Sequence, residues 1–195
     1  MNLKQITPPS ALPVSLADVK DHLNELSNDH DSKLIGFIYA ATSAVEHYTR
    51  RSLITQTWEM QFDRFHECVY LARGPVQSVS SVKYLDGTGT EQTLAADQYT
   101  VDTAADPARL FASYGVSYPS THDVRNAVKI RYVAGYGAKG HHIPEPIRHG
   151  IKMIVEDLFS NPGASIIDIS SHENPALQMM LQPFKIYGFT THDEE

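Results

Sequence analysis

The sequence predicts an α+β protein in which helices at both ends of the chain enclose a strand-rich middle. Apolar residues recur at helical spacing in residues 34–48 and again in residues 147–158, so each segment has one stripe that can be buried. Between these segments Trp58, Met60 and Phe62 alternate with polar residues, which is the period of a half-buried strand. We therefore expect a small helical bundle with a β-rich subdomain inserted into it.

The chain divides into four segments within one structural domain. We expect residues 1–54 to form an N-terminal helical hairpin, 55–143 the inserted β subdomain, 144–161 a C-terminal core helix and 162–195 a C-terminal arm. At 195 residues the chain is long enough to bury a core without metal or disulfide staples. Its one cysteine, Cys68, excludes an intrachain disulfide and favours synthesis in a reducing cytoplasm.

Capping residues delimit the two N-terminal helices. Ser15 is the expected N-cap of a helix that continues to residue 26, and Asp18 is favourable near the positive end of its dipole. The polar run at residues 28–31 ends this helix and begins a second one, which reaches about Arg51. Because the connection is so short, the two helices should pack as an antiparallel hairpin.

The middle of the chain alternates apolar and polar residues in several short runs. These predicted strands lie at residues 58–62, 78–85, 91–94, 99–101 and 128–132. The D-G-T-G sequence at residues 86–89 is a turn signal between two of them. The segment 102–123 contains Pro107, Pro119 and many small or polar residues, which predicts a large loop.

Prolines open and close the C-terminal helical region. Pro144 and Pro146 start a helix whose apolar stripe is Ile147, Ile151, Ile154, Val155 and Leu158, since proline is tolerated in a first turn. The N-P-G sequence at residues 161–163 ends that helix. Residues 165–171 are interpreted as extended, and Asn174 as the cap of a short apolar helix through Gln182.

Three ordered motifs resemble a known family. Residues 46–58 read E-H-Y-T-R-R-S-L-I-T-Q-T-W, where the second helix runs into a strand; residues 74–86 read G-P-V-Q-S-V-S-S-V-K-Y-L-D. Residues 128–137 read V-K-I-R-Y-V-A-G-Y-G and precede I-P-E-P-I at 143–147. Together these motifs resemble the head–tail connector proteins of tailed bacteriophages, also called adaptor or head-completion proteins. The resemblance covers roughly residues 14–160, and departs from the family pattern at 103–126 and after Asn161.

The resemblance implies a non-enzymatic virion component located at the head–tail interface and made in the cytoplasm of a bacterial host. Such a protein forms a homo-oligomeric ring, commonly of twelve copies, that docks on the portal after DNA packaging. It extends the DNA exit channel, has passing contact with double-stranded DNA, and receives the tail, a tail-terminator or a stopper protein. No membrane partner and no cofactor are implied.

The charge of the chain is compatible with this role. The formal net charge is -7, and the basic residues occur mostly singly apart from the Arg50–Arg51 pair. A protein that grips duplex DNA usually has a basic face, whereas a conduit should repel phosphate. A mild excess of acidic residues that only aids solubility explains the net charge of -7 equally well. We interpret Arg50 and Arg51 as a solvated helix end, favourable at the C-terminal dipole; the alternative is a contact between ring subunits.

No motif marks a catalytic, metal or cofactor site. Residues 135–140 match G-x-G-x-x-G, but Pro144 and Pro146 delay the helix that would bind a pyrophosphate, so we interpret the match as a loop. The adjacent His141 and His142 point to opposite sides of an extended chain and should not share one metal ion. Together with Lys139 they are our candidates for a loop that faces the channel lumen or an adjacent ring.

The C-terminal apolar run has two interpretations. Its members are Leu177, Met180, Leu181, Phe184, Tyr187 and Phe189. At helical spacing they would ordinarily complete the core of the protein itself. Alternatively they form an arm that docks on the portal, because aromatic residues and methionines are common at binding surfaces and the family's C-terminal region meets the portal.

Two other classes of function remain as alternatives. The first is a small hydrolase or DNA-processing enzyme of a phage packaging module, since catalytic groups can assemble in space without a local motif. The second is a cellular α+β binding module. Activity lost on substituting clustered His or carboxylate residues would indicate the enzyme, and the neighbouring genes would separate the binding module from a connector.

Overall fold

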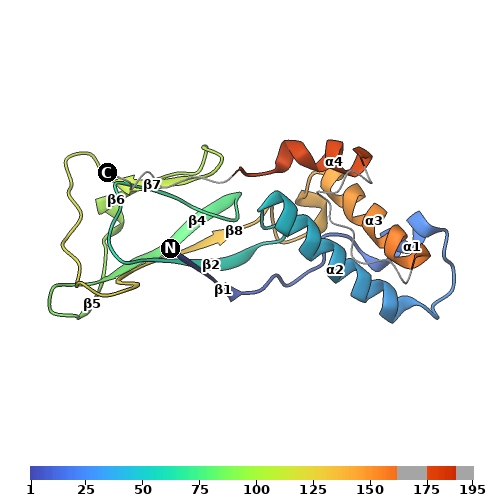
Figure 1. Ribbon diagram of the computed structural model, residues 1–195, viewed down its shortest axis with the longest axis horizontal. Helices are drawn as coiled ribbons and strands as arrows, with labels where there is room; N and C mark the ends of the chain where they lie inside the picture. The colour runs from blue at the N-terminus through green and yellow to red at the C-terminus, as the bar shows by residue number, and fades with distance from the viewer. Residues whose placement is uncertain (162–174, 188–195) are drawn as a thin grey trace. The chain divides into compact units, whose positions relative to one another are not determined.

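The computed structural model describes residues 1–161 and 175–187, which fold into two compact units (Figure 1). The helical unit consists of the described parts of Pro9–Ile54 and Tyr136–Ile186. The strand unit consists mainly of Met1–Pro8 and Thr55–Gly135. Helix and sheet are therefore both present and largely segregated along the chain, as in an α+β protein. The predicted extended segment at 165–171 lies outside the described residues.

The helical unit contains α1 (Leu16–Leu23), α2 (Asp31–Thr49), α3 (Glu145–Ser160) and the short α4 (Pro175–Leu181). The predicted N-cap of α1 is present: Ser15 Oγ accepts from the Asp18 amide at 3.0 Å, and Asp18 Oδ2 accepts from the Ser15 amide at 3.1 Å. α2 ends at Thr49, two residues earlier than the predicted end at Arg51, because Arg50 adopts a left-handed conformation and closes the helix.

One apolar core joins these helices. The predicted stripe of α2 is buried, as are Ile147, Ile151 and Val155 of α3, and the loop residues Leu53 and Ile54 complete the cluster. The buried members of the predicted α2 stripe are Leu34, Ile38, Ala41 and Val45, and its fifth member, Tyr48, is half-buried against the same core. α4 packs on α3 at Gly150, where an added Cβ would lie 3.1 Å from Leu177 and 3.2 Å from Leu181. A glycine is therefore what allows α4 to approach α3 so closely.

The strand unit contains a five-stranded antiparallel sheet in the order β1-β2-β8-β4-β5 and a three-stranded sheet in the order β3-β7-β6 (Figure 1). The larger sheet comprises β1 (Asn2–Thr7), β2 (Gln56–Phe62), β4 (Val76–Leu85), β5 (Glu91–Thr93) and β8 (Val128–Ala134). The smaller sheet comprises β3 (Cys68–Tyr70), β6 (Tyr99–Asp102) and β7 (Arg109–Ala112). Short 3-10 turns lie at Ala96–Gln98, Gly140–His142 and Gln182–Phe184.

Alternation along β2 and β8 places one face of the larger sheet in the core. Met60 and Phe62 on β2 are buried with Ile130 and Tyr132 on β8, and β3 and β7 contribute Val69 and Leu110 to the same cluster. The buried Tyr132 hydroxyl donates to the Ala72 carbonyl at 2.8 Å, which satisfies its polar atom. Burial raises the pKa of this hydroxyl well above its ordinary value.

The strand unit differs from the sequence expectation in three places. Residues 2–7 form β1, an edge strand that we did not predict, and residues 68–70 form β3. The segment expected to be a large loop, 102–123, contains β7, whose Leu110 is completely buried. The central segment of the strand unit ends at Gly135, whereas we expected the β subdomain to continue to residue 143. The loop at 136–143 therefore belongs to the helical unit.

Candidate interaction surfaces

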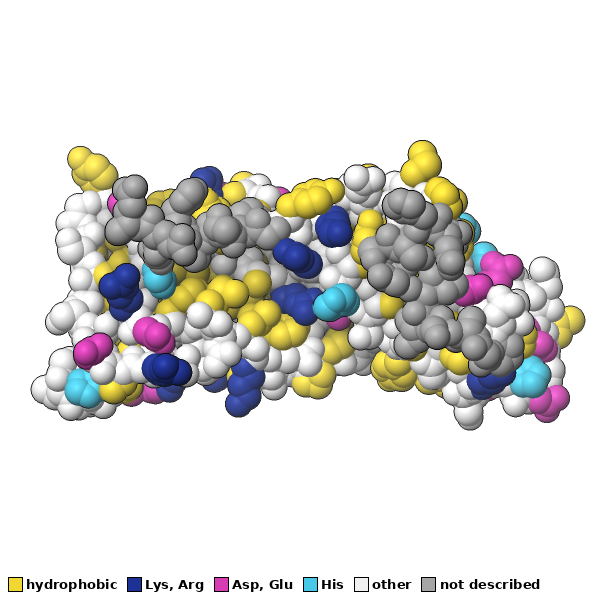
Figure 2. Space-filling view, viewed as in Figure 1, with side chains coloured by type: hydrophobic (Ala, Val, Ile, Leu, Met, Phe, Trp, Pro, Cys, Tyr) yellow, Lys and Arg dark blue, Asp and Glu magenta, His cyan; other side chains and the backbone are white. Residues whose placement is uncertain are grey.

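The predicted C-terminal docking residues are divided between core and surface. Leu177 and Leu181 are 4% and 0% exposed and pack in the core of the helical unit, while Met180 and Phe184 are half-buried against it. This placement agrees with the core interpretation for these side chains. Tyr187 is 61% exposed, and Phe189 lies outside the described residues. Figure 2 shows hydrophobic side chains projecting over α4; Met179, which the sequence pattern did not select, is 75% exposed.

The segment after α4 is fastened to the C-terminal end of α2. Arg51 is buried, and its Nε donates to the Phe184 carbonyl. The Ile186 amide donates to the Thr49 carbonyl at 2.9 Å, and Lys185 Nζ lies 4.5 Å from the centre of the Tyr48 ring. Arg51 is therefore a structural anchor inside the subunit, so our interpretation of it as part of a solvated helix end was wrong. Arg50 is exposed at the helix end, as expected.

The loop proposed to face a lumen is exposed but tightly built. Lys139, His141 and His142 all have exposed side chains. The ring of His142 packs on Gly137, where an added Cβ would lie 2.3 Å from its Nδ1. A Cβ added to Gly140 would lie 2.3 Å from the carbonyl oxygen of Pro13. The two glycines are thus required for close packing, which agrees with a loop and not with a nucleotide-binding turn.

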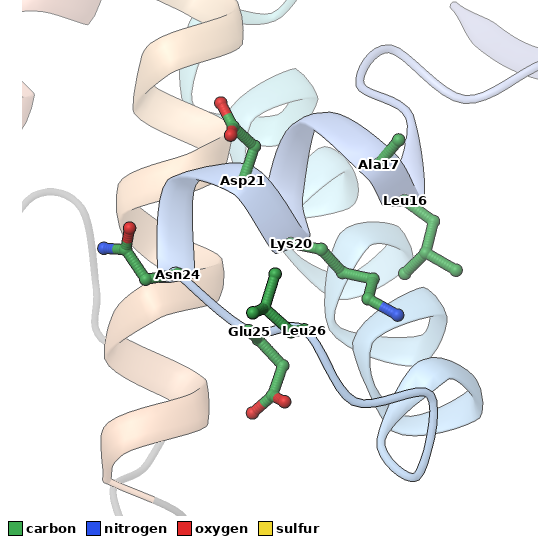
Figure 3. Close-up of a pocket in the computed structure, with 7 residues that line it drawn as sticks. All are labelled: Leu16, Ala17, Lys20, Asp21, Asn24, Glu25 and Leu26. Carbon is green, nitrogen blue, oxygen red and sulfur yellow. The ribbon is translucent and has the colours of Figure 1, made fainter.

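A groove runs beside α1 and the segment that follows it. It has a volume of about 700 Å³ and is lined by Leu16, Ala17, Lys20, Asp21, Asn24, Glu25 and Leu26. Figure 3 shows Leu16, Lys20 and Leu26 extending on the same side of α1, with Glu25 beside Leu26. Leu26 is 95% exposed. Sequence reasoning missed it because we counted it within the first helix; it lies beyond the left-handed Asn24 that ends α1.

Perturbed carboxylates in the strand unit have local structural causes. Hydrogen bonds from Thr88 and Gln92 lower the pKa of Asp86 to about 2, in the predicted D-G-T-G turn. Hydrogen bonds from Lys83 and Lys129 lower the pKa of Glu91 to about 2, because both ammonium groups lie 2.9 Å from its oxygens. These shifts arise from a turn and from cross-strand ion pairs.

A second groove, of about 600 Å³, lies in the strand unit and has a polar lining. The residues along it are Met1, Phe62, Asp63, Arg64, His66, Thr121, His122 and Asp123. Within residues 1–161 and 175–187, no group of three His, Cys, Asp or Glu side chains is placed to hold a metal ion. Its polar lining makes this groove a place at which an enzyme activity can be tested.

Charges of both signs are interspersed over the surface of the strand unit in Figure 2. On the outer face of its larger sheet Arg131 pairs with Glu59, and Lys83 and Lys129 share Glu91. A surface on which charges of both signs alternate is not the continuous basic face that tight binding of duplex DNA requires. None of the helices in the described part of the chain is long and apolar enough to cross a membrane.

Comparison of this fold with solved structures gives a clear likeness. The chain shares its fold with a component of a gene transfer agent particle. A chain in the neck of the empty particle, computed with C6 symmetry, matches with a TM-score of 0.79 and 19% identity over 98% of both chains. A chain in the neck of the native particle, computed with C12 symmetry, matches with a TM-score of 0.75 and 22% identity over 98% of both chains. A chain in the virion of the native particle matches with a TM-score of 0.74 and 19% identity, again over 98% of both chains. No family model and no curated protein matches the sequence.

Proposed function

We propose that this chain is a structural component of the neck of a tailed-phage or phage-like particle, where it forms an adaptor ring between head and tail. The likeness to neck chains over 98% of both chains is the observation that carries the proposal. The three connector-like motifs of the sequence support the proposal independently of the fold.

The ring is expected to contain twelve copies. The similar necks were computed with C6 and C12 symmetry, and twelve copies fit both. A ring of identical subunits needs heterologous contacts that close by rotation. In this assembly the four helices act as one bundle and the strand unit as its insertion.

The proposed partners are the portal on one side of the ring and a stopper, tail-terminator or tail protein on the other. Docking on the portal would use the exposed part of the C-terminal region that begins at Tyr187 and continues to Phe189. Leu177 and Leu181 would support that surface from the core. The loop containing Lys139, His141 and His142 would face the lumen or an adjacent ring. DNA would pass through without being held, in keeping with the net charge of -7.

The proposal is tested by the assembly state of the purified chain. Light scattering after size exclusion and negative-stain imaging, with and without the portal of the same particle, should detect rings of about 260 kDa, which is twelve times 21.7 kDa. A chain that stays monomeric at high concentration, both alone and with the portal, would refute the ring.

The alternative, a small hydrolase or DNA-processing enzyme, has one place in the described structure where it can be tested. His66 and Asp123 line the polar groove of the strand unit. If the purified chain cleaved DNA or a model ester and the variants His66→Ala and Asp123→Asn abolished that activity, the structural role would have to be revised. The neck proposal expects no such activity in the wild-type chain.

A further inference from the structure

The helical unit has an acidic end at the turn between α1 and α2. The carboxylates of residues 16–31 are Asp18, Asp21, Glu25, Asp29 and Asp31, and the same segment has one lysine and no arginine. That lysine, Lys20, is already engaged: its Nζ lies 2.9 Å from Asp31 Oδ1 and 2.6 Å from Asn28 Oδ1. Lys33, in the first turns of α2, lies over the rings of Phe37 and Phe159.

This acidic end also carries the groove beside α1. Its apolar lining comes from Leu16, Ala17 and Leu26, and Asp21 and Glu25 border it (Figure 3). A leucine that is 95% exposed beside a concave apolar surface is characteristic of an interaction site. The surface that fits it has an exposed apolar side chain flanked by Lys or Arg.

The opposite end of the same unit has those properties. Arg50 is exposed at the C-terminus of α2, and Lys185 lies over Tyr48 in the last turn of that helix. Residues 175–187 contain no Asp or Glu, and they present Met179 at 75% exposure. Of the nearby carboxylates, Glu46 accepts from the Leu53 amide at 2.7 Å, and Glu145 pairs with Arg148 and Lys152.

The two ends are separated by the length of α2. With 19 residues at about 1.5 Å each, this helix is about 28 Å long. A subunit with complementary surfaces at opposite ends makes a heterologous contact, which is the kind that builds rings.

Stabilisation of the helix dipole explains only part of this pattern. Asp31 and Arg50 lie at the N- and C-terminal ends of α2, where their charges are favourable for that helix alone. The dipole effect falls off within one turn, so it does not account for Asp21, Glu25 or Lys185. It also gives no reason for the exposure of Leu26 and Met179.

We propose that the acidic groove of one copy receives the basic end of the next copy, with Asp21 and Glu25 facing Arg50 and Lys185 and with Met179 against Leu26. The inference rests on the proposed ring and assigns its subunit contact. It replaces our sequence-based interpretation of Arg50 as a solvated helix end. Arg51 keeps its structural role inside the subunit.

Charge reversal at each end tests the contact. Variant A is Asp21→Lys with Glu25→Lys, and variant B is Arg50→Glu with Lys185→Glu. Each variant alone should have like charges at its contacts, so the concentration at which half the chains are in rings should rise by more than about tenfold. Mixed in equal amounts, A and B should regain rings, because every A–B contact is again complementary and a twelve-membered ring can alternate.

Matched controls separate the contact from net charge and from folding. Glu67→Lys with Asp97→Lys makes the same charge change as A at exposed positions of the strand unit, and Lys4→Glu with Arg125→Glu matches B. Both controls should assemble like the wild type. Recovery in the A plus B mixture requires both variants to be folded, and circular dichroism of each variant checks this directly.

The outcomes distinguish the contact from the ring itself. If the wild type formed rings but A and B assembled equally well, or if their mixture did not recover, the contact would be wrong and the neck function would stand. If the wild type formed no rings in any condition, the proposed function would fail and the contact with it. Leu26→Ser should also weaken assembly at high salt, where charges are screened, whereas Tyr114→Ser, at a fully exposed position of the strand unit, should not.

Discussion

At the scale of single residues, the pKa of Glu59 on β2 is set by contacts that exist only in the folded protein. Its side chain is 9% exposed, and its Oε2 accepts from Arg131 Nη2 at 2.6 Å and from Nε at 3.1 Å. Gln61 donates to Oε1 at 2.9 Å. Burial alone would raise the pKa of Glu59, but the hydrogen bonds from Gln61 and Arg131 outweigh it, so the pKa is lowered from 4.5.

A lowered pKa makes this carboxylate a source of acid sensitivity. The folded state binds fewer protons than the unfolded state near pH 4, so the stabilisation is complete above about pH 4.5 and is lost as the pH falls through the folded pKa. In the variant Glu59→Gln this loss should be absent, and the free energy of unfolding should fall less steeply between about pH 5 and 3. Urea unfolding followed by the fluorescence of Trp58, the single tryptophan and a neighbour on β2, measures this.

The partner variant provides the control. Arg131→Ala should destabilise the strand unit by about 1–3 kcal/mol at pH 7, because it leaves a buried carboxylate with fewer donors. The penalty should shrink as the pH falls and Glu59 becomes protonated. Equal acid sensitivity in the wild type and Glu59→Gln would mean that other carboxylates control the unfolding.

The residues that sequence reasoning predicted well are those whose burial follows a period. The α2 stripe, from Leu34 to Val45, and the core-facing residues of β2 are buried as expected. Leu26 and Met179 were missed for a physical reason. Leu26 follows the end of α1, and its exposure is decided by where that helix stops. Met179 lies among other apolar residues of α4, and its exposure is decided by which side of α4 packs on Gly150.

At the scale of elements, the packing of α4 on α3 depends on Gly150. Both Leu177 and Leu181 would meet a Cβ at this position, at 3.1 and 3.2 Å. The variant Gly150→Val should therefore push α4 away and destabilise the helical unit by about 1–3 kcal/mol, in spite of the better intrinsic helix propensity. Chemical denaturation monitored by circular dichroism at 222 nm measures the change.

A second glycine in a helix gives a matched control. Gly36 lies in α2 with nothing within 4 Å of an added Cβ. Gly36→Ala should stabilise the unit by about 0.5–1 kcal/mol, because alanine loses less conformational entropy in a helix. If Gly150→Val were as well tolerated as Gly36→Ala, α4 would not be held where the structure places it.

The elements that were not predicted are short or exposed. β1 is an edge strand in which only Leu3 and Ile6 are partly buried, so its sequence lacks a clear alternation. β3 and β7 have three and four residues, and β7 lies close to Pro107 in a segment rich in small residues. β1 is stabilised by pairing with β2, β3 by pairing with β7, and β7 by pairing with β6 as well. These pairings and the core beneath the strands are not visible in a local window of sequence.

At the scale of the whole molecule, the six predicted docking residues belong to two different parts of the C-terminal region. Leu177 and Leu181 stabilise the fold, and Tyr187 remains exposed. The sequence could show that the run was apolar, but it could not show which members the core would take, because helical spacing is the same for a core face and a docking face. A truncation that removes both parts together would confuse loss of folding with loss of docking.

Two truncations at different points separate these roles. Removing residues 175–195 deletes α4 and exposes the core around Gly150, and each lost leucine should cost about 2–5 kcal/mol, so this chain should unfold at a much lower temperature. Removing residues 188–195 leaves the last described contact, the bond from the Ile186 amide to Thr49, in place. This shorter truncation, combined with Tyr187→Ser, should keep the melting temperature while portal co-sedimentation is lost. If the combined variant still co-sedimented with the portal as the wild type does, docking would have to use another surface, and the exposed loop with Lys139 and His141 would be the next to test.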